Sequence, residues 1–287
     1  MPDKPLPIFI GAEAAHPEQK TLITTRTGEP YQPARVYYQV SNQKTVIGAF
    51  KKLRCMQFEP SLSSWRWLYD QEAKKLQFQI SHHKIPKEHR PIVLGDFYFL
   101  SEHDLVLDIR SFDRVIQAIL FFDKRINRRA AQVAKIRIVN KFFDANTQKD
   151  EPYLHPPFDF FFDRGDIDAP NPDELEKKML DLAEEHEGEA AQRNAMLAYL
   201  EEKNKRPLPE IEEIPVYFYE DGISQLQMML SMRTIEVMQH WRGNTSFRQY
   251  DIIRNMAESL MQQFSEFPEE FSEDESDDLQ PPSVHHS

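Results

Sequence analysis

Alternating apolar and polar positions in the first half of the chain predict β-strands. Arg35–Val40 is rich in aromatic and β-branched residues, which strands favour. Trp65–Tyr69 and Leu76–Ile80 both alternate with period two around a polar segment, so they predict a hairpin, with a helix over the first segment as the alternative. Pro91–Leu100 and Leu105–Arg110 flank a polar turn and predict a second hairpin.

Two stretches between these strands have helical spacing instead. Residues 43–54 place Val46 and Phe50 on one face, and Ser111 stands at the N-cap of a helix that we expect to end near Asn127. The chain then returns to alternation over Val133–Phe143. The pattern predicts an α+β fold whose N-terminal part is a largely antiparallel sheet with two covering helices.

The second half of the chain is predicted to be mainly helical. Asn171 caps a helix that begins with a proline, breaks near Gly188 and resumes to about Lys203. Ile214–Tyr219 has strand composition, and we expect it to join the sheet of the first half. Two further helices are predicted, one over Ile223–Trp241 and one after the capping-box pattern that starts at Ser246.

The same patterns divide the chain into five parts. We predict an extended N-terminal arm (1–34), a basic α+β domain (35–145), a linker that packs by its aromatic residues (146–170), a mainly helical region with one strand at 214–219 (171–266) and a disordered acidic tail (267–287).

Composition excludes several function classes. The 287 residues include only 8 glycines, and the glycine-rich phosphate-binding motifs and the GxSxG nucleophile motif are absent from the sequence. Cys55 is the sole cysteine, so no intrachain disulfide can form, which fits a reducing compartment and a cytoplasmic protein. No run of 18 apolar residues occurs, so we expect no membrane insertion. We predict no cofactor.

Charge is distributed very unevenly. Residues 35–145 hold 20 Lys and Arg against 11 Asp and Glu, a net charge of +9, whereas residues 146–287 hold 12 against 32, a net charge of −20. A basic block joined to an acidic one predicts a surface for an anionic partner, and an acidic tail that screens it.

The cations predicted to form this surface lie on one strand, around one helix end and at Arg66. Lys and Arg on an outward strand face can bind a polyanion, although they also serve to complement a helix dipole or to keep a strand soluble. The predicted binding residues are Arg66, Lys124, Arg125, Arg128, Arg129, Lys135, Arg137 and Lys141.

Two other groups of residues are candidates for function. Asp163, Asp166 and Asp168, with His155 as a base, predict a metal-dependent hydrolase of phosphate esters as the alternative function, because paired carboxylates bind Mg²⁺ or Mn²⁺. Met228, Met229 and Met232 predict a helix surface for a protein contact, with core packing or a homodimer as the other interpretations.

No motif of the sequence predicts a catalytic mechanism, so we interpret the chain as a non-enzymatic binding or assembly protein. Its expected partner is an acidic protein surface or a nucleic acid, and it is a candidate homo-oligomer.

Overall fold

The computed structural model describes residues 20–146, 156–169, 171–216 and 222–265. Clustering of residue contacts divides the chain into two units, 1–249 and 250–287. The second unit contains nearly all of helix α7 (Gln249–Ser265), where Arg254 forms ion pairs with Asp251 and Glu258 on its own helix. All other described elements belong to the first unit.

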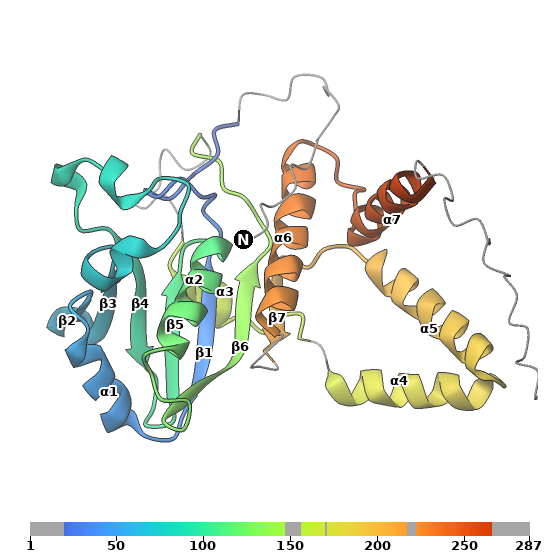
Figure 1. The fold of residues 1–287 in the computed structure, drawn as a ribbon, viewed down its shortest axis with the longest axis horizontal. Helices are drawn as coiled ribbons and strands as arrows, with labels where there is room; N and C mark the ends of the chain where they lie inside the picture. The colour runs from blue at the N-terminus through green and yellow to red at the C-terminus, as the bar shows by residue number, and fades with distance from the viewer. Residues whose placement is uncertain (1–19, 147–155, 170, 217–221, 266–287) are drawn as a thin grey trace, which may run out of the picture. The chain divides into compact units, whose positions relative to one another are not determined.

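The described strands form one seven-stranded sheet in the order β2-β3-β4-β5-β1-β6-β7, with every neighbouring pair antiparallel (Figure 1). This arrangement confirms the predicted fold class. The strands are β1 (Ala34–Val40), β2 (Met56–Glu59), β3 (Ser64–Leu68), β4 (Val93–Phe99), β5 (Asp104–Ile109), β6 (Ala131–Val139) and β7 (Ile211–Pro215).

Three helices bury one face of this sheet. They are α1 (Gln43–Lys52), α2 (Phe112–Asp123) and α6 (Gly222–Trp241), whose apolar residues join one core cluster with those of the strands. Asn42 and Ser111 cap α1 and α2 through side-chain oxygens that accept backbone N–H bonds, as expected for Ser111. Two covering helices were predicted, and α6 is the third.

Strand β7 comes from the second half of the chain and joins the sheet of the first half, as predicted. It pairs with β6 and begins three residues before the predicted strand. Residues 217–219 of the predicted strand lie outside the described residues. Because β7 completes the sheet, the two halves of the chain share one folded core.

The predicted hairpin of Trp65–Tyr69 with Leu76–Ile80 is wrong. Strand β3 pairs instead with β2 and β4, and Leu76–Ile80 is not a strand. Leu76 and Phe78 pack against the core although the segment that carries them is irregular. Their alternation therefore reflects contact with the core and not strand pairing.

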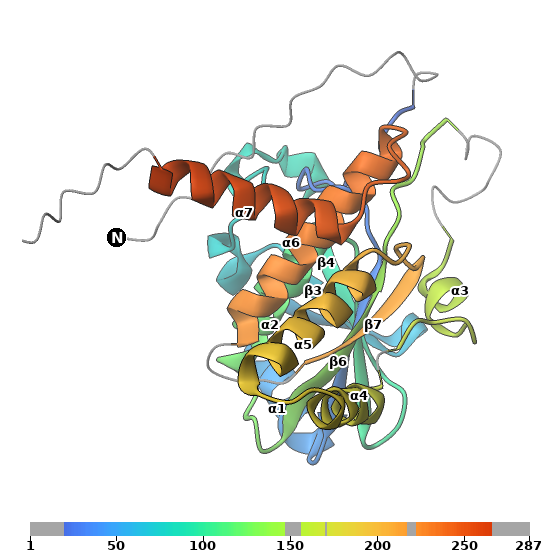
Figure 2. The same ribbon diagram turned by 90° about the vertical axis from the view of Figure 1, so that its right-hand side faces the viewer.

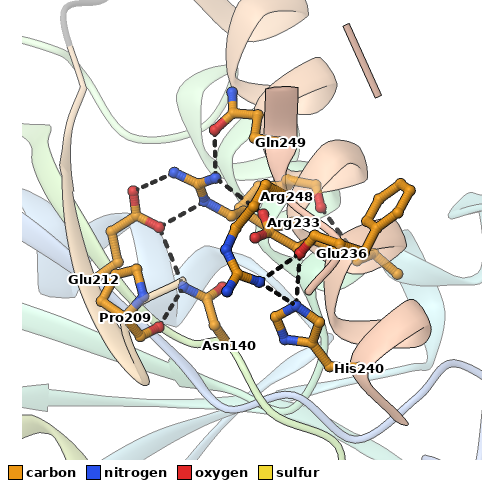
Figure 3. A network of polar contacts seen from close by, with 11 residues as sticks. Asn140, Pro209, Glu212, Arg233, Glu236, His240, Arg248 and Gln249 are labelled. Atoms are coloured by element: carbon orange, nitrogen blue, oxygen red, sulfur yellow. Dashed lines mark hydrogen bonds and ion pairs between the residues drawn. The ribbon is translucent and has the colours of Figure 1, made fainter. Parts of the chain in front are cut away.

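A polar network fixes α6 to the sheet (Figure 3). Arg233 of α6 donates to both carboxylate oxygens of Glu212 in β7, at 2.7 and 2.8 Å. Asn140, just after β6, donates to the same carboxylate at 3.2 Å. Arg233 is also 3.7 Å from the buried carboxylate of Glu236. Helix, edge strand and neighbouring loop are thus held by one set of charge-assisted bonds.

The described part of the predicted N-terminal arm, residues 20–33, packs onto the fold. Ile23 and Tyr31 belong to a second apolar cluster, together with Phe161 and Phe162. Phe161 and Phe162 belong to a short helix, α3 (Phe158–Phe162), in the predicted aromatic linker. Figure 2 shows α3 on the opposite side of the strands from α2.

The predicted long helix is two helices, α4 (Pro172–Glu185) and α5 (Glu189–Asn204), with the break at Gly188 as expected. Asn171 caps α4 with its side chain, also as expected. The predicted acidic tail, residues 267–287, lies outside the described residues.

Candidate functional site

The face of the sheet opposite α1, α2 and α6 carries polar residues in two transverse rows. In β1, Ala34 and Val36 point into the core, so Arg35 and Tyr37 lie on the other face. Register then places a residue of every neighbouring strand beside them. The first row is Gln57, Arg66, Asp96, Asp108, Arg35, Arg137 and Glu213, and the second row is Ser64, Tyr98, Val106, Tyr37 and Lys135. We call these two rows, with Arg110, the polar face.

Arg35 is the centre of this face. Its guanidinium donates to both oxygens of Asp108, with Nε–Oδ1 at 2.6 Å and Nη2–Oδ2 at 3.0 Å. It also donates to Asp159 of α3 at 2.7 Å, lies 3.6 Å from Asp163 and stacks over the ring of Phe162. Burial raises the pKa of Asp108, and the hydrogen bonds from Arg35 oppose that shift. Arg35 thus joins α3 to the sheet.

Asp96 lies beside Asp108 in the first row and has a different environment. Arg66 and Arg110 each approach its carboxylate to 3.7 Å, which is an ion pair without a hydrogen bond. Burial raises the pKa of Asp96, against the effect of Arg110 and then Arg66. The Asp96 side chain is 11% exposed, whereas those of Arg66 and Arg110 are 34% and 31% exposed. The Asp96 carboxylate is therefore more deeply buried than the two guanidinium groups, and Arg66 also lies 3.2 Å from a second carboxylate, that of Glu59.

The other end of the polar face repeats this layering. Lys135 and Arg137 both bind Glu213, at 2.9 and 2.8 Å, and Glu213 is less exposed than either cation. Burial alone would raise the pKa of Glu213, but the hydrogen bonds from the two cations outweigh it and hold that pKa below its usual value. Both cations also stack over the ring of Tyr37.

The two tyrosines of the second row are half-buried and lie on either side of Val106. Burial raises the pKa of Tyr98 to about 12, with Asp96 and Asp108 acting in the same direction. Tyr37 likewise has a raised pKa, chiefly through burial. Both phenols therefore stay protonated at neutral pH and can donate hydrogen bonds to an anionic ligand.

The structure separates the predicted cationic residues into two groups. Arg66, Lys135 and Arg137 lie on the polar face. The other five lie at the end of α2, on its loop to β6, or after β6, and they are Lys124, Arg125, Arg128, Arg129 and Lys141. Because α2 covers the opposite face of the sheet, the two groups do not form one surface.

Most cations of the second group are engaged within the chain. Arg125 donates to the carbonyl of Phe121 and stacks on its ring, and Arg128 makes a two-bonded contact with Asp123. Lys141 lies 3.5 Å from Glu210. These contacts match the helix-end and solubility interpretation of cations in the sequence.

Sequence reasoning missed Arg35, Tyr37, Tyr98 and Arg110. Alternation within β1 and β4 could have placed Arg35, Tyr37 and Tyr98 outside the core. It could not show that Asp108 and Asp96 lie beside them, since that follows from the strand order.

The carboxylates proposed for a hydrolase are not brought together. Asp163 faces Arg35, Asp166 is bound by Arg164, and Asp168 bonds through its backbone to Ile211 and Glu213. His155 lies outside the described residues. Among the residues that the structure describes, no three His, Cys, Asp or Glu side chains are arranged to hold a metal ion. No observation favours this alternative.

Two other sequence features have structural explanations. Met232 is buried and Met229 packs against the core, whereas Met228 is exposed on α6. Cys55 is fully buried, and burial with the nearby Glu72 carboxylate raises the pKa of its thiol to about 12. Such a thiol is a core residue and a poor nucleophile at neutral pH.

Two further findings bear on function, and several predictions stay open. In the described part of the chain, no helix is both long and apolar enough to cross a membrane. The predicted protein partner, homo-oligomer and screening by the acidic tail stay predictions. Comparison with protein-family models, with curated proteins and with solved structures finds no match to this chain.

Proposed function

We propose that this chain is a non-enzymatic binding protein whose polar face binds an acidic segment of a partner protein. The observation that carries the proposal is the layering of charge on this face. Arg66 and Arg110 lie above the buried Asp96, so a ligand meets two guanidinium groups before it meets the carboxylate. Guanidinium groups held near a surface form strong bonds with carboxylates.

The half-buried tyrosines support the same ligand class. Tyr98 is a neighbour of the Asp96 position on β4, and Tyr37 lies under Lys135. Tyrosines and arginines are enriched where proteins bind one another, because both combine apolar contact with polar bonds. Their combination on the polar face fits a peptide with carboxylates and apolar groups.

An acidic protein segment fits better than a nucleic acid. Asp159 of α3 and Asp163, the residue that follows this helix, are well exposed at the border of the polar face, beside Arg35. A continuous phosphate backbone crossing the face would meet this negative border, and the net charge of −12 adds general repulsion. A short acidic segment can bind without crossing the border formed by Asp159 and Asp163. A cation of the same partner segment can bind these two carboxylates.

The test measures binding of a fluorescein-labelled oligoglutamate by anisotropy at low salt. Arg66→Gln/Arg110→Gln removes two charge-assisted contacts of about 1 kcal/mol each at partly exposed positions. The expected loss of affinity is therefore about 30-fold. Arg128→Gln/Arg129→Gln is the matched control, because it removes two cations of the predicted set that lie away from the polar face, and it should leave the affinity unchanged.

A triple variant, in which Asp96→Asn is added to Arg66→Gln/Arg110→Gln, tests whether the lost binding results from unfolding. The Asp96→Asn substitution removes the buried carboxylate that the two arginines approach, so the variant does not leave Asp96 buried without a cation. Equal affinity of the Arg66/Arg110 variant and the unmodified protein would refute the proposal. Tighter binding of a labelled oligouridylate than of oligoglutamate would assign the face to nucleic acid instead.

A further inference from the structure

Helices α4 and α5 form a hairpin, residues 172–204, that buries very little of itself. Of the α4 side chains that the structure describes, only Leu182 is buried, and none of the 16 residues of α5 is. The hairpin is held by its turn, where Gln192 donates to the carbonyls of Ala183 and His186 at 2.9 and 3.1 Å. Helices of this length are marginal in water without packing against another surface.

Apolar side chains are exposed on both helices of this hairpin. Met179 and Leu180 of α4 are 49% and 59% exposed, and Leu197 and Leu200 of α5 are 57% and 40% exposed. Leu197 and Leu200 are three residues apart and so share one side of α5. Single exposed leucines are common on soluble proteins, but four large apolar side chains exposed on one weakly packed hairpin indicate a surface that is covered when it functions.

The hairpin is also strongly acidic, and its acids have few partners. Residues 172–204 contain ten Asp and Glu against four Lys and Arg, a net charge of −6. Across the described residues, Glu201 is the one carboxylate of this segment found in an ion pair, with Lys205. The carboxylates of the polar face differ, since Asp96, Asp108 and Glu213 are all paired with arginine or lysine.

We propose that the α4–α5 hairpin docks a basic amphipathic helix of another protein. Its leucines and methionines would meet Met179, Leu180, Leu197 and Leu200, and its lysines and arginines would meet the unpaired carboxylates around them. A second copy of the hairpin is a poor occupant, because it would set a net charge of −6 against another −6. This surface is separate from the polar face, so the proposal does not depend on the function assigned to that face.

The test uses the full chain and a labelled synthetic helix of leucine and lysine, with binding measured by anisotropy. Leu197→Gln/Leu200→Gln and Met179→Gln/Leu180→Gln alter exposed side chains only, so they leave the fold intact. Each should weaken binding at least about tenfold, since two apolar contacts are lost. Ile253→Gln/Met256→Gln on α7 is the matched control, because its side chains are similarly exposed, and it should bind like the unmodified protein.

Hydrogen exchange provides a second measurement. Bound peptide should slow amide exchange within residues 172–204, and added salt should weaken binding because opposite charges meet at the contact. Equal weakening in the α7 control, or no weakening in either hairpin variant, would overturn the proposal. So would a dimer in light scattering that Leu197→Gln/Leu200→Gln converts to a monomer, because a second copy would then cover this surface.

Discussion

Substitution of Arg35 by methionine tests the charge arrangement at the centre of the sheet. Methionine keeps an apolar side chain of similar length over Phe162 but removes the two bonds to Asp108. The Asp108 side chain is only 8% exposed, so the variant leaves a carboxylate that is buried without its partner. Breaking a buried ion pair in this way costs about 3–5 kcal/mol of unfolding free energy. Asp159 and Asp163 are exposed and add little to that loss.

The loss of unfolding free energy in the Arg35→Met variant should depend on pH in a defined direction. Burial already raises the pKa of Asp108, and loss of the opposing Arg35 bonds raises it further. A carboxyl with a higher pKa in the folded state binds more protons there, so the variant loses stability as the pH rises from the unfolded pKa of about 4. The deficit relative to the unmodified protein is therefore greatest at neutral pH and decreases toward about pH 4.

Urea unfolding followed by tryptophan fluorescence measures these differences, because Trp67 is buried in the core. Arg35→Met/Asp108→Leu removes both charges and should recover most of the loss, as replacement of a whole buried pair often does. A deficit below about 1 kcal/mol at neutral pH would refute the reasoning. A deficit that does not change with pH, or a double variant as unstable as the single one, would refute it equally.

Three further predictions concern single positions. Asp96→Asn should tighten oligoglutamate binding about threefold, measured by anisotropy, since Arg66 and Arg110 lose the carboxylate that they share, while Arg66 keeps its contact with Glu59. Cys55 should react with a thiol reagent only after denaturation, as its thiol is buried with a pKa of about 12, and rapid reaction of the folded protein would contradict this. Gly95→Ala should cost about 1–3 kcal/mol in urea unfolding, because a Cβ there would lie 2.8 Å from the carbonyl oxygen of Asp108, and an unchanged midpoint would count against that packing.

The sequence predicted correctly those elements whose signals, such as a helix cap or a helix break, are formed by residues close together in the chain. Ser111 and Asn171 cap the helices that they were expected to cap, and Gly188 separates α4 from α5. The alternation of Leu76–Ile80 failed as a strand signal because an irregular segment can also pack alternate residues, here Leu76 and Phe78, against the core. Strand β2 is only four residues long and too short to give a period.

The candidate site could be predicted only in part, because it depends on pairs that are distant in sequence. Lys135 and Arg137 were identified as outward cations, which their places in the second and first rows confirm. Their partner Glu213 comes from β7, and nothing near either cation in the sequence points to it. Net charge over a segment counts ionised groups but does not show which of them neutralise one another.

The connection between β6 and β7 has a consequence for how the molecule can vary. Asp168 accepts a backbone bond from Glu213 at 2.8 Å and donates one to Ile211 at 3.0 Å, so the chain leaves and re-enters the sheet at one point. The α4–α5 hairpin is therefore an insertion closed at its base, and the free energy of closing such a loop changes only logarithmically with its length. Insertions, deletions or an exchange of the whole hairpin can accumulate there while the sheet keeps its register, so the two surfaces can evolve at different rates.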